Sequence, residues 1–346
     1  MTLEPPLIRV GLLGHGQAGA VLHAPLIEAG SDFRISVVAT SRPESLAQRR
    51  DAPRQVTDAR ALIEADDVEL VVITTPNDLH FAQAAAALEA GKHVVVDKPF
   101  GVTTAQADRL VALAKSKDRV LTVFHNRRLD GDFLGVRRAI DSGDLGEILL
   151  FEARWDRFRP VPPQGWKNAA TPGVGLLWDL GPHLVDQAQL LFGPPDTVAA
   201  DIAVQRRGSA VDDYFELTLT YGRMRCILSA ATVVAAARPR FAAHGTRASF
   251  LTFGVDPIEA ALHAGRHPLD PDFTRDLPPI PAELVRGETR EARPLAAGDW
   301  PAFYRQVAAA IREGAPAPVE PTEARDVVAL IEQAYAAANP SCGSRR

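Results

Sequence analysis

Short apolar runs alternate with helix-like segments over the N-terminal part of the chain, and this alternation restricts the fold more than any other feature of the sequence. Five runs read as strands, at residues 7–14, 33–40, 69–75, 93–97 and 119–125. They are apolar on both faces, which is typical of strands buried between two layers of helices. Strand and helix in regular order therefore predict a doubly wound parallel sheet over residues 1–125.

One of the intervening helices carries signals at both ends. Residues 78–91 are predicted to be helical, with Asp78 as the N-cap and Gly91 at the C-terminal end. An Asp side chain can accept one of the N–H groups that the first helical turn leaves without a partner, and Gly adopts the left-handed conformation that ends many helices.

A different pattern begins near residue 145. Longer, partly alternating strands are expected at residues 146–160, 197–207, 213–222 and 223–234, with Tyr221-Gly222 as a hairpin turn. An amphipathic segment at 175–193 interrupts them, residues 268–281 form a Pro-rich loop, and 300–313 and 322–338 are expected to be closing helices. Residues 126–346 are thus predicted to form an α+β substrate-binding and oligomerisation domain on a large, mainly antiparallel open sheet.

Charge and cysteine content exclude several classes of protein. The net charge of −5, without a basic cluster free of nearby acids, provides no field for a nucleic-acid backbone or an anionic membrane. Two cysteines are too few for a disulfide framework or a thiolate metal site. Because the N-terminus lacks a signal-peptide pattern and no stretch of about 18 apolar residues occurs, we expect a cytoplasmic protein.

A glycine-rich loop follows the first predicted strand directly. Residues 14–19 read GHGQAG, which is the GxGxxG pattern in its required setting, between a strand and a helix. Glycines there allow a tight turn and close approach of the backbone to a pyrophosphate, whose charge meets the helix N-terminus. The loop predicts a Rossmann dinucleotide site whose contacts are Gly14, Gly16, Gln17, Ala18 and Gly19.

The end of the second strand indicates which dinucleotide binds. A site that prefers NAD usually places Asp or Glu there, about 20 residues after the glycine loop, to hold the ribose hydroxyls. This chain has Ser41 and Arg42 instead. A hydroxyl and a guanidinium suit a 2′-phosphate, so NADP is predicted, with NAD as the alternative. The competing interpretation is that Arg42 is a solvated loop charge.

Two further strand ends should face the cofactor, because ligands of doubly wound sheets lie beyond the carboxyl ends of the strands. The predicted contacts there are Thr75, Pro76, Asn77, His80, Asp97 and Lys98. Lys98 follows the valine strand at 94–96, where its ammonium can donate to the oxygen on the carbon that gains or loses hydride. A lysine that only caps the strand and pairs with Asp97 is the alternative. The Lys98-Pro99 bond is predicted to be cis.

The amphipathic segment at 175–193 supplies a second set of polar residues. Asp179 and His183 lie four apart and share a helical face if the helix runs through Pro182, whereas a helix that begins at Pro182 leaves Asp179 in the preceding turn. Carbonyl reduction needs a proton donor that titrates near neutrality, and His oriented by a carboxylate fits this need. The spacing of His15, His23, His80 and His125 matches no common metal-ligand pattern, so no metal is expected.

Taken together, these motifs resemble those of the Gfo/Idh/MocA family of oxidoreductases. The family pattern combines the glycine loop, a Glu-Lys-Pro motif at a strand end and an Asp-x-x-x-His motif, which match residues 14–19, 97–99 and 179–183. Asp97 stands where Glu is commoner, so the contact of this shorter acid with the nicotinamide ribose is expected to differ. The stretches VGLLGHGQAGAVLHAPLI, TTPNDLHF, GKHVVVDKPF, VFHNRRLDGDF and RFRP resemble the bacterial branch that contains NADP-dependent scyllo-inositol dehydrogenases.

The resemblance implies a catalytic set and a mode of assembly. Lys98 would polarise the reacting oxygen, and His183 would act as acid and base beside Asp179. The open sheet of the second domain would join subunits into a homodimer or homotetramer.

The expected activity is reversible hydride transfer between NADP(H) and a cyclic polyol or sugar, most specifically scyllo-inositol and scyllo-inosose. Predicted substrate contacts are Asn126, Asp156, Arg157, Trp166, Asp179 and His183, with Arg127, Arg128, Trp155, Arg159, Asp186 and Tyr304 as further pocket candidates. Alternatives are a dehydrogenase for another sugar, a dihydrodiol or a linear tetrapyrrole, and a dinucleotide-sensing regulator without turnover. Such a regulator would be expected to lose one of the three catalytic side chains.

Overall fold

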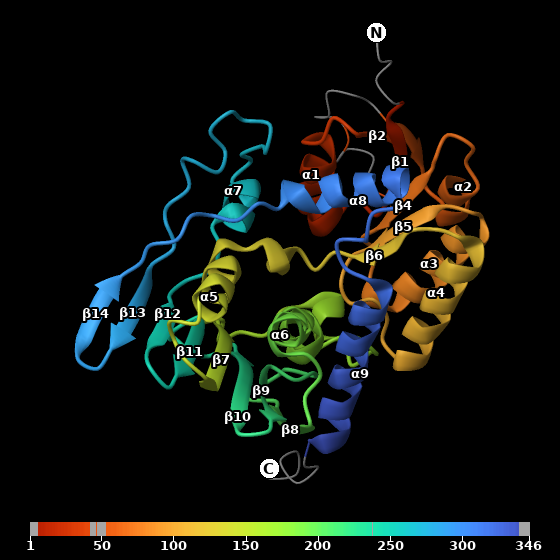
Figure 1. The fold of residues 1–346 in the computed structure, drawn as a ribbon. Helices are drawn as coiled ribbons and strands as arrows, with labels where there is room; N and C mark the ends of the chain where they lie inside the picture. Colours follow the sequence, from red (N-terminus) through yellow and green to blue (C-terminus); the bar gives the residue numbers. More distant parts are fainter. Residues whose placement is uncertain (1–5, 42–45, 47–52, 237, 339–346) are drawn as a thin grey trace. The chain divides into compact units, whose positions relative to one another are not determined.

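The chain divides into two compact units, each of which is described by itself (Figure 1). The computed structural model describes residues 6–41, 46, 53–236 and 238–338. Unit 1 contains Met1–Phe124, Ile258–Asp276 and Asp299–Arg325, and unit 2 contains His125–Pro257, Leu277–Gly298 and Asp326–Arg346. The sequence predicts one boundary between residues 125 and 126, next to the end of the first long stretch of unit 1. It assigns the two later stretches of unit 1 to the second domain, at residues 126–346.

Unit 1 is a Rossmann fold. Its six strands are all parallel, in the order β3-β2-β1-β4-β5-β6, which confirms the predicted doubly wound sheet. The elements are β1 (Ile8–Leu13), η1 (Ala18–His23), α1 (Ala24–Glu28), β2 (Phe33–Ala39), β3 (Arg54–Val56), α2 (Ala59–Ile63), β4 (Leu70–Ile73), η3 (Asn77–Leu79), α3 (His80–Glu89), β5 (His93–Val96), α4 (Thr104–Lys117), β6 (Leu121–Val123), α7 (Ile258–His263) and α8 (Pro301–Glu313). Every residue of β4 is buried, as a strand between two helical layers requires.

Of the two caps predicted for the helix after β4, the C-terminal one is confirmed and the N-terminal one is not. Gly91 has a left-handed φ of +76° just past α3, as predicted. The N-cap prediction for Asp78 is wrong, because α3 begins at His80 and its N-cap residue is Leu79. After Pro76 the chain tightens into the 3₁₀ turn η3, in which the Leu79 N–H donates to the Pro76 carbonyl (2.9 Å), and this turn moves the α-helical start by two residues.

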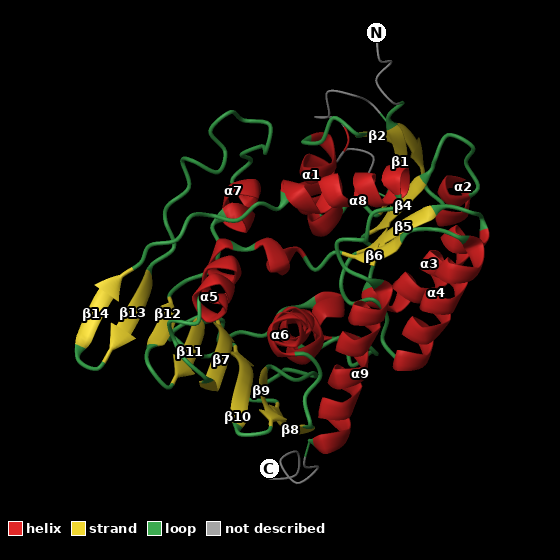
Figure 2. Ribbon diagram, in the orientation of Figure 1, coloured by secondary structure: helices red, strands yellow, loops and turns green. Residues whose placement is uncertain are grey.

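Unit 2 is an eight-stranded sheet in the order β14-β13-β12-β11-β7-β10-β9-β8, with only the β7–β10 pair parallel (Figure 2). Its elements are η4 (Asn126–Leu129), α5 (Gly131–Asp141), β7 (Ile148–Asp156), η5 (Gly165–Asn168), α6 (Leu176–Phe192), β8 (Thr197–Ala203), β9 (Tyr214–Tyr221), β10 (Met224–Ala231), β11 (Phe241–Gly245), β12 (Ser249–Thr252), β13 (Ala282–Arg286), β14 (Thr289–Ala292) and most of α9 (Pro321–Ala337). This confirms the mainly antiparallel sheet. The hairpin turn consists of Gly222 and Arg223, since Tyr221 still pairs with Met224.

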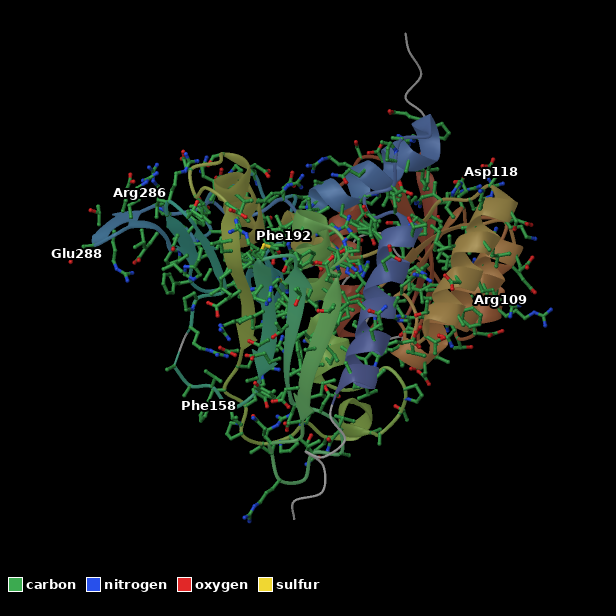
Figure 3. The ribbon with its side chains drawn as sticks, turned by 60° about the horizontal axis from the view of Figure 1, so that its bottom comes forward. Arg109, Asp118, Phe158, Phe192, Arg286 and Glu288 are labelled. Carbon is green, nitrogen blue, oxygen red and sulfur yellow. The ribbon has the colours of Figure 1, made fainter. Side chains whose placement is uncertain are left out.

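Helix α6 lies on one face of this sheet, where it packs against β9 and β10. At its C-terminal end the ring of Phe192, labelled in Figure 3, lies 5.1 Å from that of Phe151 on β7. At its N-terminal end, Asp212 accepts the Leu177 N–H (2.7 Å). Gly175 precedes the helix at φ +127°, and a Cβ there would lie 2.1 Å from an Asp212 oxygen, so only glycine fits beside this long-range cap.

The helix runs through Pro182, so the interpretation in which a helix begins at that residue is wrong. A proline interrupts one backbone hydrogen bond, but α6 is buried along most of its length and capped at its start, and this packing overrides the local signal. Asp179 and His183 therefore share one helix at i and i+4. In the part of the chain that the structure describes, no helix is long and apolar enough to cross a membrane.

Candidate active site

The three glycines of the loop after β1 have different surroundings. Gly14 (φ +94°) has its would-be Cβ 2.9 Å from the Thr74 carbonyl, and that of Gly19 would lie 2.3 Å from the Gly14 carbonyl. Thr74 further supports the turn by donating its hydroxyl to the Gly14 carbonyl (2.9 Å). A Cβ on Gly16 would meet nothing within 4 Å. The outer glycines thus serve the tight turn and the close helix packing, whereas Gly16 leaves open space where a pyrophosphate can approach the backbone.

The segment after the loop is a π-helix rather than a regular α-helix. In η1 the Ala24 N–H bonds back to the Gly19 carbonyl, five residues earlier. The wider turn ends at His23, whose side chain is fully buried. Its Nδ1 lies 2.7 Å from the Tyr304 hydroxyl of α8, and its Nε2 lies 3.8 Å from an Asp97 oxygen. Tyr304, a predicted pocket candidate, is instead buried within unit 1.

Asp97 and Lys98 follow β5 as the sequence predicts, and the Lys98-Pro99 bond is cis, also as predicted. Asp97 Oδ1 accepts the backbone N–H of Lys98 (2.9 Å). Burial raises the pKa of Asp97, but the nearby ring of His23, 3.8 Å away, and the charges of Lys98 and His80 outweigh burial and leave that pKa below its usual value. The carboxylate therefore stays ionised behind the lysine.

The side chain of His80, a predicted cofactor contact, is buried against the main chain. The residue is 1% exposed, and its ring nitrogens face two backbone carbonyls, with Nδ1 2.8 Å from Pro99 O and Nε2 2.9 Å from Thr75 O. The same helix holds Thr75 a second time, because the Thr75 hydroxyl donates to Gln83 (2.6 Å). The ring of His80 thus supports the backbone of two neighbouring segments, at Thr75 and at Pro99.

The predicted 2′-phosphate site is described only in part. The Thr40 N–H bonds to the Val56 carbonyl (3.1 Å), and Ser41 is exposed just after β2. Arg42 lies outside the described residues. The side chain of Trp166, in η5, likewise lies outside them.

In unit 2, α6 presents Asp179 and His183. His183 is 6% exposed, and the centroid of its ring is 5.8 Å from that of Trp155 and 6.4 Å from that of His125. Asp179 is half exposed and lies 3.4 Å from a guanidinium nitrogen of Arg157. Helix α6 therefore carries the buried imidazole of His183 one turn from the solvent-exposed carboxylate of Asp179. This arrangement suits a proton donor and an acid that orients it.

Two carboxylates that were predicted to hold substrate are occupied by arginines. Both oxygens of Asp186 accept from Arg128 (2.8 and 2.6 Å), and Asp186 is 2% exposed. Both oxygens of Asp156 accept from Arg238 (2.6 and 2.8 Å). Because Trp155 faces His183, strand alternation turns Asp156 to the opposite face of the sheet. Neither acid is brought to His183 as a substrate acceptor.

A cluster of buried charges surrounds Trp155, and of its two arginines the sequence analysis names Arg127 but not Arg240. The guanidinium carbons of Arg127 and Arg240 lie 4.9 and 4.5 Å from the indole centroid. Burial lowers the pKa of Arg240 to about 10 although Asp132 and Asp130 oppose the shift, and burial raises the pKa of Asp132 despite the charge of Arg240. No motif marks Arg240, because its partners come from distant parts of the chain.

Asn126 and Arg159 complete the predicted set. Asn126 is 4% exposed at the start of η4, and Arg159 is exposed beyond β7. Among the described residues, no group of three or more His, Cys, Asp and Glu side chains could hold a metal ion.

The chain matches two family descriptions in succession. Residues 8–125 match "Oxidoreductase family, NAD-binding Rossmann fold" of GFO_IDH_MocA, and residues 137–342 match the "C-terminal alpha/beta domain" of the same family. The chain belongs to the Gfo/Idh/MocA family. This Gfo/Idh/MocA protein is therefore an NAD(P)-dependent oxidoreductase that acts on CH–OH groups of a small-molecule substrate.

Similar proteins span nearly the whole length of this Gfo/Idh/MocA chain. The scyllo-inositol 2-dehydrogenase (NADP(+)) IolW of Bacillus subtilis is 38% identical, over 94% of this chain and 92% of that protein. The oxidoreductase YdgJ of Escherichia coli, whose function is uncharacterised, is 42% identical over 94% of each chain. Among solved structures, biliverdin reductase from Synechocystis has a TM-score of 0.78 at 22% identity, over 96% of this chain and 99% of that chain, and shares the fold.

Proposed function

We propose that the protein is an NADP(H)-dependent dehydrogenase that interconverts scyllo-inosose and scyllo-inositol, or a closely related cyclic polyol. The observation that carries this proposal is the full-length similarity to a scyllo-inositol 2-dehydrogenase (NADP(+)), at 38% identity over 94% of the chain. Lys98, Asp179 and His183, the three side chains of the family's catalytic pattern, are all present. A sensor without turnover would not need all three.

The residues of unit 1 fit a dinucleotide. Gly16 leaves room for the pyrophosphate, and Ser41 is exposed at the end of β2, beside Arg42 in the sequence. We infer that these two side chains hold the 2′-phosphate of NADP, and that residues 75–77 and Asp97 border the nicotinamide end. The bound cofactor would supply the hydride.

The chain's own residues would manage the proton and the charge. In ketone reduction the carbonyl carbon gains a hydride, and its oxygen gains a proton. The Lys98 ammonium would donate a hydrogen bond to that oxygen as negative charge develops on it. His183 would deliver the proton, with Asp179 holding its ring. In the reverse direction His183 must be neutral to accept the proton of the alcohol, so polyol oxidation should improve as pH rises.

The remaining substrate contacts are fewer than the sequence predicts. Arg157, next to Asp179, and Asn126 stay in the proposal, as does Trp166. Asp156 and Asp186 leave it because arginines occupy their oxygens. A ring with a hydroxyl on every carbon needs convergent polar groups, and a site built for them discriminates strongly against analogues that lack a hydroxyl.

Turnover of a ketone panel tests the proposed substrate. NADPH oxidation is followed with scyllo-inosose, a deoxy analogue, a keto-glucoside and a hydrophobic ketone. We expect scyllo-inosose to have the highest kcat/KM, and the deoxy analogue to lose about tenfold or more for a missing hydrogen bond to a polar site. No turnover of scyllo-inosose, or a preference for the hydrophobic ketone, contradicts the proposal.

We also infer that the protein is a homodimer or homotetramer joined through unit 2. Helices α5 and α6 pack against the sheet of unit 2, and its other face carries half-buried side chains such as Leu150, Ile227 and Val285. Light scattering on the purified protein gives the mass directly, and a monomer at all concentrations contradicts the inference.

A further inference from the structure

The hydrogen-bonded ladder between β4 and β5 ends just before the catalytic lysine. The two strands pair up to Ile73 and Val96, and the Asp97 N–H then donates to the Ile73 carbonyl (2.8 Å). Two residues further on stands Pro99, which has no N–H with which to continue the ladder. Some other group must therefore connect the segments that follow β4 and β5 if the backbone around Lys98 is to be fixed.

The ring of His80 makes that connection. It lies between the carbonyl of Thr75, after β4, and the carbonyl of Pro99, after β5, at 2.9 and 2.8 Å. We call this arrangement of Thr75, His80 and Pro99 the His80 bridge. Since His80 is the first residue of α3, the bridge also ties both strand ends to that helix.

The two acceptors place a demand on the ring. A carbonyl oxygen only accepts, and a neutral imidazole has one N–H, so a neutral ring would turn a lone pair toward one carbonyl in a buried site. A doubly protonated ring donates to both.

We propose that His80 is a positioning residue that donates from both ring nitrogens and thereby fixes the backbone of Lys98 for the chemical step. It touches neither cofactor nor substrate and acts through the Pro99 carbonyl. The role assigned to Lys98 rests on the proposed function, whereas the protonation of the bridge does not.

Two conservative variants separate the two arms of the bridge. In His80→Asn the amide nitrogen can replace Nδ1 and keep the bond to Pro99, and in His80→Gln it can replace Nε2 and keep the bond to Thr75. We expect His80→Gln to lower kcat on the order of tenfold or more, because small displacements of catalytic groups are costly, and His80→Asn to lower it less. The dissociation constant of NADPH should change by about twofold at most, since the glycine loop is untouched.

The Lys98→Met background shows whether His80 acts through the lysine. If it does, adding His80→Gln to Lys98→Met lowers the residual kcat no further. Multiplied losses in the double variant, or equal kcat values for the Asn and Gln variants, overturn the positioning role. A loss of thermal stability with kcat unchanged in both variants would show that the bridge serves the fold alone.

Ring-nitrogen NMR tests the bridge without any substrate. In the ¹⁵N-labelled wild-type protein at neutral pH, the His80 signals are those that disappear in His80→Asn. We expect both of its nitrogens to carry protons, with and without NADPH. One unprotonated nitrogen overturns the proposed state of the bridge, whether or not scyllo-inosose is a substrate.

Discussion

The two units hold their functional groups in different ways. In unit 1 the residues at the strand ends are held by the main chain: His80 contacts two carbonyls, and Asp97 accepts an amide. In unit 2 the polar side chains around α6 are held by one another, as in the Arg128–Asp186 and Arg157–Asp179 pairs.

This difference between main-chain and side-chain partners predicts how each unit responds to amino-acid substitutions. Main-chain partners remain after any substitution elsewhere, so a lost side chain in unit 1 leaves no charged partner behind. When one member of a charge pair in unit 2 is removed, the other member loses that compensating charge, and burial makes the loss costly. Substitutions that break a buried charge pair in unit 2 should therefore cost more stability than substitutions at the strand ends of unit 1.

The largest effect is expected from Asp186→Asn in unit 2. Arg128, with 12% of its side chain exposed, would lose the charge of Asp186, and breaking a buried pair costs about 3–5 kcal/mol. Denaturant unfolding measures the loss. The matched control is Glu147→Gln, which breaks an exposed pair with Arg223 and should cost about 1 kcal/mol or less. Equal losses in the two variants would contradict the comparison.

Two substitutions, Lys98→Met in unit 1 and His183→Asn in unit 2, test the effect on catalytic activity. Each should lower kcat by roughly 100-fold or more, or about 2.7 kcal/mol in the barrier, with NADPH binding largely kept. Single-turnover kinetics and cofactor titration separate the two quantities. A variant with near-normal turnover would return its residue to a structural role, which for Lys98 is capping of the strand end.

Arg42→Ala tests the cofactor preference that unit 1 is predicted to have. A charge-assisted contact to the 2′-phosphate contributes about 1.5–3 kcal/mol, so NADPH should bind about ten- to a hundredfold more weakly. NADH binding should hardly change, because NADH lacks that phosphate. Fluorescence titration with NADPH and with NADH gives the ratio of the two dissociation constants. If the wild-type protein binds NADH as tightly as NADPH, the assignment of Arg42 to the 2′-phosphate is wrong.

The smallest effect is expected from His93→Asn at the start of β5. Burial, followed by the charge of Arg119, lowers the pKa of His93 from 6.5 to about 4. Between these values the unfolded chain binds a proton that the folded chain does not, so stability is fully present above pH 6.5 and declines as pH falls toward 4. Because the ring is only half-buried, we expect a loss of about 1–2 kcal/mol.

Asn can still accept the Val120 N–H that His93 Nδ1 now accepts at 3.0 Å. The variant should therefore keep its stability at neutral pH and lose less of it on acidification. Unfolding curves at several pH values from about 7 to 4.5 measure the difference between the two proteins. Parallel profiles would show that the decline comes from other groups.

The sequence by itself determined the parallel sheet, the glycine loop and the position of Lys98. These features depend on local rules, since apolar strands alternate with helices and ligand-contacting residues follow the strand ends. β3 escaped prediction because Arg54–Val56 is a short edge strand without an apolar pattern. The Asp78 cap failed because one tight turn, invisible in the pattern, displaced the helix start.

Only the tertiary structure decided which polar side chains are available for chemistry. Asp156, Asp186 and Asp179 carry the same charge. Both carboxylate oxygens of Asp156 and of Asp186 accept hydrogen bonds from an arginine, whereas Asp179 remains half exposed. It also decided that the ring of His80 contacts two backbone carbonyls and that α6 continues through Pro182. The physical reason is the same in each case: a partner that is distant in the sequence, such as Pro99 for His80 or Asp212 for α6, outweighs the local preference once burial excludes water.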